Sequence, residues 1–450
     1  MGAFHAYDVR GVYNVDFNRK DVYKIGYHLV GYLGAREVIV GRDARSSSPE
    51  IFEALSRGIM DAGADVLSLG LATTPMVYYA TATLGKQASV QITASHNPRE
   101  YNGLKVSREN AVPVGYDTGL GEIERRCREQ TISPAPQPGQ LRELDIREEY
   151  VAFLQSFARD ISQLEIAIDC SNGMAGLLIH DVLPPGSYAL LYDEVDGRFP
   201  NHEANPLIPE NTRALRELVL AERCDAGMIF DGDGDRVVFV DERGRAVPSD
   251  IMLAVMGHYF LTPENPQRQR VLVDIRTSRA VAEHLGPMGA DVQTWRVGRA
   301  FMAPRLREID GLFGGELAGH YYFRDFFYSD SGLLAAIILL NVVADLKRQG
   351  GSLARLVDSI NTYANSGEVN FTIEDKAGAM EAVKNHFVRQ QPPLALYDYD
   401  GYRVEYADWW FNIRPSNTEP LLRFLAEARD PQTLEQKLHE TREILAPFQR

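Results

Sequence analysis

The sequence predicts an α/β protein built from several domains, and three observations support this fold class. The chain has 450 residues, more than one hydrophobic core usually organises, and at about 150 residues per domain this length suggests roughly three domains. Apolar residues make up 45% of the chain and charged residues 24%, as in an average soluble globular protein and unlike a disordered or fibrous one. Short apolar runs alternate with helical patterns, which is typical of βαβ units in parallel or mixed sheets.

Three β-loop-α units follow one another along the chain. The first has a buried strand at 37–40, a polar turn and a helix that begins at Ser48 and Pro49, since serine caps helices and proline fits their first turn. Strand-like runs at 166–168 and 271–273 each lead into a polar loop in the same way. This repetition predicts three similar mixed-sheet α/β domains in tandem.

A fourth segment differs from the other three. From about residue 366 the pattern predicts a C-terminal α+β domain, with a strand at 369–373, a helix at 379–388, aromatic strands around 397–410 and a helix from Pro431. The clearest linker is the proline-rich stretch 133–139, which cannot hold a helix. We therefore expect four domains, at residues 1–145, 146–246, 247–365 and 366–450.

Charge and cysteine content exclude several classes of partner and location. The net charge of −15 gives a field that repels nucleic acid, so an anionic ligand needs a local basic cluster. Three cysteines without a CxxC pair supply neither a disulfide framework nor a zinc site, and the N-terminal residues lack a secretory signal, which predicts a cytoplasmic protein. The longest apolar run, 333–344, is too short for a bilayer span of about 20 residues and predicts a buried helix. We expect neither a nucleic acid nor a membrane as partner.

The most distinctive segment carries three carboxylates, Asp231, Asp233 and Asp235, which alternate with glycines and lie between strand-like runs. Oxygens spaced in this way can converge on one hard cation such as Mg²⁺ or Ca²⁺. An EF-hand uses the same spacing, but it requires glycine where this chain has Arg236 and helices where this chain has strands. The pattern therefore predicts a cation in a catalytic type of loop.

A second polar loop follows the alternating strand at 89–92. Pro98 stops regular pairing, so Ser95 and His96 lie at a strand end where side chains and backbone amides are available for chemistry. Because neighbouring residues of an extended strand point to opposite faces, we do not expect His96 to serve as the base for Ser95. Lys105 follows a glycine-containing turn that could bring its ammonium group back to this loop, although the loop alone would also fit a capped turn.

Two further loops have residues that suit a phosphorylated sugar. Arg414 precedes a polar turn that contains Ser416, Asn417 and Thr418. Its guanidinium, together with the hydroxyl, amide and backbone N–H groups of the turn, suits a phosphate, and Arg423 lies nearby in the sequence. Glu316 and His320 lie in a glycine-rich loop that could hold sugar hydroxyls. Either segment alone would also fit an ordinary polar loop. The chain has no P-loop, dinucleotide or hydrolase-elbow motif.

Together these segments resemble the α-D-phosphohexomutase family over essentially the whole chain. Segment 93–98 resembles its phosphoserine loop, 231–236 its metal loop, 315–320 its sugar loop and 414–420 its phosphate loop, in the family's order. Segments 4–11 and 41–43 also match the family's N-terminal signatures. The resemblance implies four domains around one central cleft, each lending one loop.

The resemblance also implies a mechanism. Phosphorylated Ser95 would donate its phosphoryl group to a hexose monophosphate, and the resulting hexose 1,6-bisphosphate, which is also the activator, would reorient and return its other phosphoryl group. Phosphoryl transfer relies mainly on positioning and electrostatics. Mg²⁺ would be held by Ser95 together with Asp231, Asp233 and Asp235. The groups around the transferring phosphoryl would be Arg10, His96, Arg236, Lys105 as general acid or base, and His320, which would assist proton transfer.

On the same resemblance, Glu316 would hold sugar hydroxyls, and the nonreacting phosphate would be held by Arg414, Ser416, Asn417, Thr418 and Arg423. Two residues depart from the family pattern. Ala318 stands where many sugar loops have serine, and Arg299 stands where members often have histidine. The sugar loop is nearer to that of phosphomannomutase/phosphoglucomutases than to that of phosphoglucosamine mutases, which stay the alternative. We expect mannose or glucose phosphate as substrate and a monomer or homodimer.

Three other classes stay open. A haloacid-dehalogenase-type phosphatase would use an aspartate of the 231–235 loop as nucleophile, although Asp235 stands where that class normally has threonine or valine. A glycosyltransferase could use residues 231–233 as its metal motif. A non-enzymatic sugar-phosphate sensor would keep the binding loops without needing Ser95.

Overall fold

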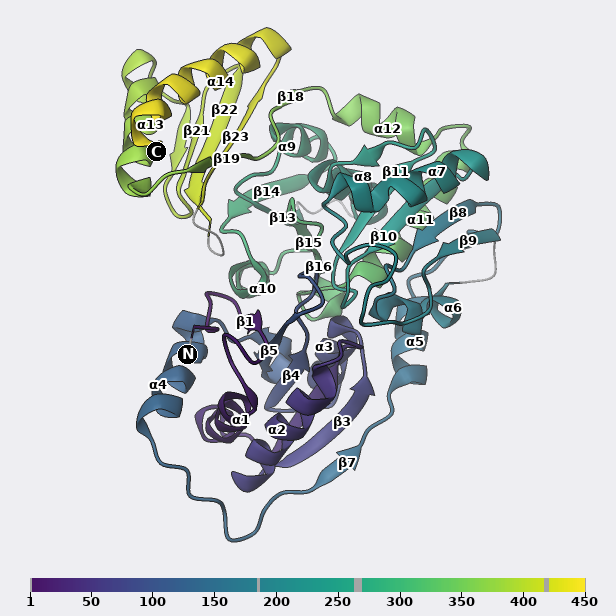
Figure 1. The fold of residues 1–450 in the computed structure, drawn as a ribbon. Coiled ribbons are helices and arrows are strands. Elements are labelled where there is room, and N and C mark those ends of the chain that lie inside the picture. Colours follow the sequence, from purple (N-terminus) through teal and green to yellow (C-terminus); the bar gives the residue numbers. More distant parts are fainter. Residues whose placement is uncertain (1, 184–186, 263–268, 417–420, 450) are drawn as a thin grey trace.

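The computed structural model describes residues 2–183, 187–262, 269–416 and 421–449. Four β-sheets follow one another along the chain, with the first at the bottom of Figure 1, the second and third above it and the fourth at the upper left. The first three sheets contain both parallel and antiparallel strands, and the fourth contains antiparallel strands. The predicted fold class, three mixed-sheet α/β domains and a C-terminal α+β domain, is therefore confirmed.

The first sheet has the strand order β1-β5-β4-β2-β3-β7, with β6 beside β5. Its strands are β1 (Val9–Val12), β2 (Glu37–Arg42), β3 (Asp65–Leu71), β4 (Ala88–Ile92), β5 (Tyr101–Arg108), β6 (Val112–Pro113) and β7 (Leu141–Glu143). Its helices are α1 (Arg19–Leu33), α2 (Ser48–Asp61), α3 (Thr74–Thr83) and α4 (Gly121–Glu129). Helices α1, α2 and α4 pack on one face and α3 on the other. Every residue of β4 is therefore buried, and not only every second one as the alternating pattern suggested.

The second and third sheets each have two parallel and two antiparallel strand pairings, in the orders β12-β11-β10-β8-β9 and β14-β13-β15-β16-β17. The second contains β8 (Glu165–Asp169), β9 (Ser187–Leu191), β10 (Ala226–Phe230), β11 (Val237–Asp241) and β12 (Ala246–Val247), with α5 (Arg147–Gln155), α6 (Ile179–Val182) and α7 (Arg213–Ala221). The third contains β13 (Gln269–Asp274), β14 (Ala290–Trp295), β15 (Phe313–Gly315), β16 (Tyr321–Phe323) and β17 (Ser329–Asp330), with α8 (Ser249–Phe260), α9 (Arg279–Leu285), α10 (Arg299–Glu308), α11 (Gly332–Arg348) and α12 (Leu353–Ile360).

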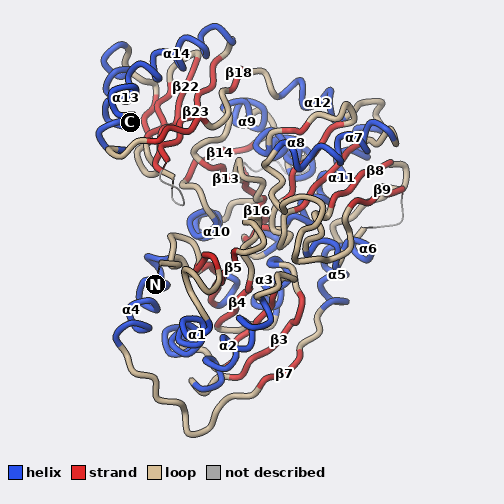
Figure 2. Tube along the Cα trace, in the orientation of Figure 1, coloured by secondary structure: helices blue, strands red, loops and turns tan. Residues whose placement is uncertain are grey.

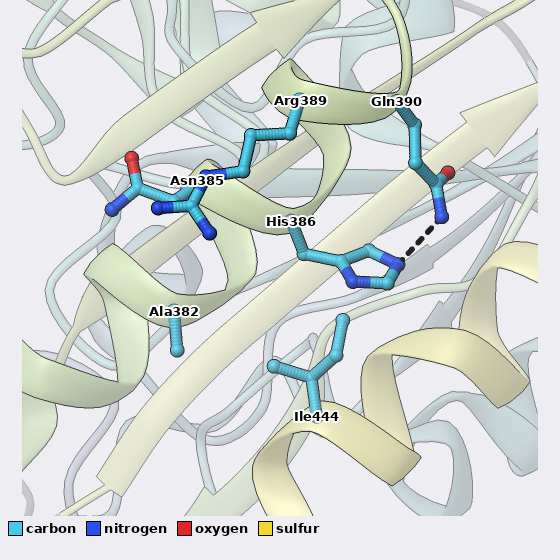
Figure 3. Close-up of a pocket in the computed structure, with 6 residues that line it drawn as sticks. All are labelled: Ala382, Asn385, His386, Arg389, Gln390 and Ile444. Atoms are coloured by element: carbon cyan, nitrogen blue, oxygen red, sulfur yellow. Dashed lines mark hydrogen bonds between the residues drawn. The ribbon is translucent and has the colours of Figure 1, made fainter.

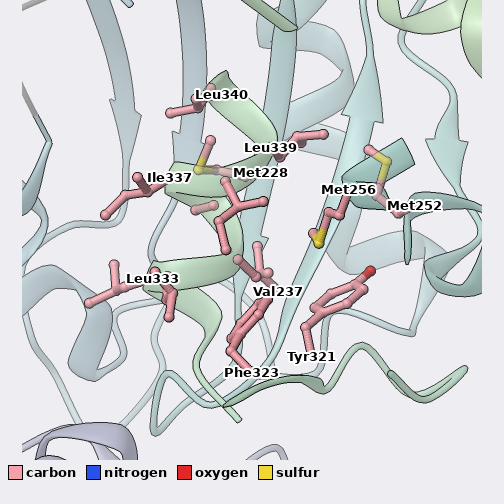
Figure 4. Close-up of a cluster of buried hydrophobic side chains, with 14 of the residues drawn as sticks. Met228, Val237, Met252, Met256, Tyr321, Phe323, Leu333, Ile337, Leu339 and Leu340 are labelled. Carbon is pink, nitrogen blue, oxygen red and sulfur yellow. The ribbon is translucent and has the colours of Figure 1, made fainter. Parts of the chain in front are cut away.

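The apolar helix α11 joins the second and third sheets into one packed unit. It lies against β10 and β11 of the second sheet and against α8, and Figure 4 shows Leu333, Ile337 and Leu340 of α11 beside Met228 of β10. The same hydrophobic cluster includes Val77 and its neighbours on α3 of the first domain. The one polar residue within the apolar run, Asn341, is buried and donates to the carbonyl of Phe157, 2.8 Å away. The first three domains therefore share a continuous core.

The fourth sheet has a core of its own. Its order is β18-β23-β22-β21-β20, with β19 also paired to β23. The strands are β18 (Ala364–Asn365), β19 (Val369–Thr372), β20 (Ala395–Tyr397), β21 (Tyr402–Glu405), β22 (Trp409–Pro415) and β23 (Leu421–Ala428), and helices α13 (Lys376–Gln390) and α14 (Pro431–Leu445) pack against them. Hydrogen bonds join the fourth domain to the third: Arg403 donates to the carbonyls of Ile275 and Thr277.

Loops gather between α3, β10 and β16, where the first three domains meet (Figure 2). Among the residues that the structure describes, none of the helices combines the length and the apolarity that crossing a membrane requires. The domain limits that we expect stay a prediction.

Candidate active site

Ser95 lies in the loop that follows β4 and has a left-handed backbone conformation, with φ of 53°. Its N–H donates to Thr93 Oγ1 at 2.9 Å, and its Oγ donates to Asp231 Oδ2 at 2.6 Å. Because this conformation interrupts the strand alternation, His96 does not point away from its neighbour as we expected. His96 Nδ1 lies 3.4 Å from Ser95 Oγ.

Arg45 binds the backbone of the Ser95 loop through hydrogen bonds. Its side chain is completely buried and its Nε donates to Asp43 Oδ2 at 3.0 Å. Its two terminal nitrogens donate to four loop carbonyls, those of Ser95, Asn97, Pro98 and Tyr101. A planar guanidinium can reach several acceptors at fixed angles. Sequence reasoning missed Arg45, although it follows directly on the polar turn of the first β-loop-α unit.

The metal loop connects β10 and β11, and its three aspartates are fully buried. One oxygen each of Asp231, Asp233 and Asp235 lies within 4.8 Å of the others. Burial, and then the charges of the other two, raise the pKa of Asp231 well above its usual range. Among the described residues, Asp233 Oδ1 and Asp235 Oδ1 accept no hydrogen bond. Buried negative charge with unused hard oxygen atoms fits a divalent cation such as Mg²⁺.

Lys105, on β5, contacts the metal loop, whereas the sequence suggests that its ammonium group returns to the Ser95 loop. Its Nζ donates to Asp233 Oδ2 at 2.6 Å and to Asp235 Oδ2. Although burial acts to lower the pKa of Lys105, the two carboxylates outweigh it and the pKa is raised, so the ammonium keeps its proton. Thr74, at the start of α3, also donates to Asp233 Oδ2, at 2.5 Å. Sequence reasoning missed Thr74, although threonine before proline is a helix-start signal.

Arg10 and Arg236 add positive charge around Ser95. Arg10, on β1, donates to Asn97 Oδ1 at 2.8 Å and to Asp8 Oδ2 at 2.5 Å. Arg236 Nε lies 3.8 Å from Asp231 Oδ2. Burial, and then Arg236 and Arg10, lower the pKa of His96 well below its usual range, so its ring is neutral. A chain with net negative charge thus holds a local cationic cluster that suits an anionic ligand.

The sugar loop lies beside the metal loop, because His320 and Arg236 form a β-bridge. Glu316 is buried, and its two oxygens accept from the Tyr322 hydroxyl at 2.5 Å and from the Gly298 N–H at 2.9 Å. These bonds fix the orientation of the Glu316 carboxylate.

Asp330, which sequence reasoning missed, joins His320 and Arg299. His320 Nδ1 lies 2.6 Å from Asp330 Oδ2, and Arg299 Nε donates to Asp330 Oδ1 at 3.1 Å. Arg299 also donates to the carbonyl of Ala111 and lies over the Tyr78 ring, 3.7 Å from its centroid. Arg299 therefore links the third domain to the first.

The residues expected to hold the nonreacting phosphate form a second cluster, on the fourth domain. Arg414 on β22 and Arg423 on β23 are directly opposite in the sheet register, and both donate to Glu368. The N–H of Ser416 donates to the Leu421 carbonyl at 2.9 Å. Asn417 and Thr418 lie outside the described residues.

A separate hollow of about 550 Å³ lies between α13 and α14 (Figure 3). It is lined by Ala382, Asn385, His386, Arg389, Gln390 and Ile444. His386 Nε2 and Gln390 Nε2 are 2.8 Å apart there. Among the described residues that line it, none is a predicted site residue.

Family models match all four parts of the chain. They are described as phosphoglucomutase/phosphomannomutase alpha/beta/alpha domains I, II and III, at residues 1–132, 148–244 and 248–363, and as the C-terminal domain, at residues 368–444. A phosphomannomutase of Escherichia coli K12 is 33% identical over 440 residues and 95% of each chain. A Xanthomonas campestris pv. campestris protein named phosphohexose mutases is 34% identical over 452 residues and 99% of each chain.

One solved structure covers nearly the whole fold. A phosphoglucomutase/phosphomannomutase family protein from Burkholderia thailandensis matches with a TM-score of 0.88 at 26% identity, over 99% of this chain and 97% of that chain. The similarity in sequence and in structure thus extends over all four domains.

Proposed function

Because the chain belongs to the phosphoglucomutase/phosphomannomutase family, it is a phosphosugar mutase, and we propose that it acts on mannose or glucose phosphate through a phosphoserine at Ser95. The observation that carries this proposal is the Ser95 hydroxyl, which is 2.6 Å from one of three clustered aspartates. A sensor or a glycosyltransferase would not need a hydroxyl there. A phosphatase that uses an aspartate as nucleophile is less well supported, because Asp235 stands where that class normally has threonine or valine.

In the first transfer, the bond between phosphorus and Ser95 Oγ breaks and a bond forms to a hydroxyl oxygen of the hexose monophosphate. A proton leaves that hydroxyl and one proton joins Ser95 Oγ. We assign these proton transfers to Lys105, as general acid or base, with His96 beside the transferring group; Lys105 is protonated in the site and the His96 ring is neutral. The product is a hexose 1,6-bisphosphate, which is also the activator that loads Ser95.

The aspartates Asp231, Asp233 and Asp235 and an oxygen on Ser95 would hold Mg²⁺. Bound there, the ion would supply positive charge that stabilises the transferring phosphoryl group. Arg10 and Arg236 would bind the same group through their guanidinium N–H donors.

In the second transfer, the bisphosphate turns round and its other phosphoryl group returns to Ser95, which restores the phosphoserine and releases the isomer. Glu316 would hold sugar hydroxyls, and the nonreacting phosphate would be held by Arg414, Ser416, Asn417, Thr418 and Arg423. The names of the two relatives support a mannose or hexose phosphate substrate. The alternative, a phosphoglucosamine mutase, is less well supported.

An assay of the purified protein with Mg²⁺, a trace of glucose 1,6-bisphosphate and several hexose 1-phosphates tests this function. We expect conversion of mannose 1-phosphate, glucose 1-phosphate or both to the 6-phosphates. Protein labelled with the bisphosphate should keep its label in hydroxylamine, because phosphoserine resists this reagent and phosphoaspartate does not. Release of the label, or binding without turnover, would contradict the phosphoserine mechanism.

We also propose that the enzyme works in the cytoplasm as a monomer or homodimer. The three buried cysteines support a reducing compartment. Light scattering coupled to size exclusion tests the oligomeric state, and a tetramer or larger assembly would contradict it.

A further inference from the structure

Three arginines from two domains converge on Glu368, the residue directly before β19. The nearest nitrogen to a Glu368 oxygen lies at 3.2 Å for Arg414, 3.4 Å for Arg423 and 3.4 Å for Arg276. Arg414 and Arg423 belong to the fourth domain, whereas Arg276 follows β13 of the third. Glu368 therefore pairs with arginines of both domains.

The arginine pair on the fourth sheet needs such a counter-charge. Arg414 and Arg423 are direct cross-strand neighbours, and like charges in this position destabilise a sheet. The side chain of Arg414 is only 4% exposed, so water screens the repulsion poorly. Although burial acts to raise the pKa of Glu368, Arg276, Arg414 and Arg423 lower it, and the carboxylate stays ionised beside them.

A series of contacts leads from Glu368 to the sugar loop. Arg276 donates to Glu368 with one nitrogen and to both oxygens of Asp274 with two others, at 2.7 and 3.1 Å. Asp274 Oδ2 in turn accepts from the N–H of Leu317, at 2.7 Å. Leu317 follows Glu316, so the carboxylate expected to hold the sugar and the arginines expected to hold the distal phosphate are joined by four successive polar contacts.

We propose that Glu368 is a positioning residue, which keeps Arg414 and Arg423 side by side and, through Arg276 and Asp274, sets their distance from the sugar loop. This inference rests on the proposed function, because it gives the two ends of a hexose phosphate two linked binding sites. The distal phosphate does not react, so its contacts are shared by the ground state and the transition state. A loss at Glu368 should therefore act on KM and leave kcat largely unchanged.

Glu368→Gln keeps the shape of the side chain and removes its charge. We expect KM for the hexose 1-phosphate to rise about tenfold or more, with kcat within about threefold of the wild-type value. Glu368→Asp keeps the charge on a shorter side chain and should give an intermediate KM. Glu381→Gln is the matched control, because Glu381 lies in the same domain and pairs with Lys384 on α13 and not with the arginine cluster. The KM of this control variant should equal that of the wild type.

Calorimetry with glucose 1,6-bisphosphate in EDTA measures the same effect without turnover. Glu368→Gln should weaken binding by about the same factor as it raises KM. Tighter binding would show that Glu368 competes with the phosphate, and unchanged binding with unchanged KM would show that it only supports the fold; either result overturns the inference. If Glu368→Gln fails to fold, an unchanged KM in Glu368→Asp overturns it instead. Wild-type protein that binds no hexose phosphate would overturn the proposed function as well.

Discussion

Ser95 Oγ lies 2.6 Å from Asp231 Oδ2, although 136 positions separate the two residues in the chain. The Ser95 hydroxyl of the first domain thus contacts the metal loop of the second domain. Arg45 fixes one side of this contact through the carbonyls of the Ser95 loop. The β-hairpin of β10 and β11 fixes the other.

Replacement of the hydroxyl tests its covalent role. Ser95→Ala should lower kcat by at least about a hundredfold, because the phosphoryl group loses its acceptor. Ser89→Ala is the control, since the Ser89 hydroxyl is also buried in the first sheet but has no hydrogen-bond partner among the described residues. The measurement is steady-state turnover, together with the mass of the intact protein after incubation with bisphosphate. Phosphorylation of Ser95→Ala to the wild-type extent would contradict the assignment.

The metal loop is tested by removing one charge. Asp233→Asn should raise the Mg²⁺ concentration for half-maximal activity and lower kcat about tenfold or more. The fold should survive, since the amide oxygen can still accept from Thr74 and Lys105. EDTA should abolish wild-type turnover, and added Mg²⁺ should restore it. Asp193→Asn, which changes an exposed partner of His180, is the control; a Mg²⁺ titration of Asp233→Asn that matches the wild type would exclude Asp233 as a ligand.

The loops of this site could be predicted from the sequence because their chemistry is local. Three aspartates within five positions repel one another in any fold, and glycines between them allow the tight path. The strands on either side of the loop were equally visible as short apolar runs. The aromatic strands of the C-terminal domain can also be predicted from local sequence, because they do not depend on contacts with other domains.

Residues that act through distant partners could not be predicted in this way. Arg45, Asp330 and Glu368 are ordinary charged residues until folding brings their partners to them. The position of His96 was predicted wrongly because strand alternation does not continue through the left-handed Ser95. Helix α11 was expected to be buried, but periodicity does not reveal that it packs against the sheet of the preceding domain.

The support that Arg45 gives to the Ser95 loop leads to a third prediction. Arg45→Lys keeps the positive charge but cannot reach four carbonyls at once, so buried acceptors lose their donors. We expect the free energy of unfolding to fall by about 1–3 kcal/mol and kcat to fall with it, because Ser95 is no longer held in place. Arg57→Lys changes an exposed arginine that pairs with Asp61 and keeps its charge, so it should change stability by less than about 1 kcal/mol. Denaturant unfolding of both variants provides the comparison, and equal effects would contradict the role of Arg45.

The buried carboxyl group of Asp250 should make the free energy of unfolding depend on pH. It is buried where α8 begins, and its two oxygens accept from the N–H groups of Ser278 and Ile251. Burial raises the pKa of Asp250 from 3.8 to about 6. Because the folded state then binds the proton more tightly than the unfolded state, Asp250 contributes most stability below about pH 4, and this contribution is lost as the pH rises through about 6.

Asp250→Asn is uncharged at every pH and therefore removes this dependence. Relative to the wild type, its free energy of unfolding should rise between pH 4 and pH 7 by up to about 3 kcal/mol, the value that corresponds to the change in pKa. Denaturant titrations of both proteins at each pH give this difference, in which the other titrating groups cancel. A difference that is constant with pH would show that folding does not raise the pKa of Asp250.

Substrate range is the last prediction, and it depends on Glu316. The Tyr322 hydroxyl and the Gly298 N–H hold this carboxylate, and the family resemblance assigns it to the hydroxyls at C3 and C4, where glucose and mannose are identical. Glucose and mannose 1-phosphate should therefore both be turned over, with kcat/KM values within about 10–200-fold of each other, because a hydroxyl that is not engaged discriminates weakly. Glucosamine 1-phosphate should be poor, since Ala318 offers no side-chain acceptor for its ammonium group. The kcat/KM values for the three sugar phosphates, measured at one Mg²⁺ and one bisphosphate concentration, test this prediction. A preference for the amino sugar, or a difference above roughly 10³ between glucose and mannose, would show that a residue other than Glu316 reads the C2 position.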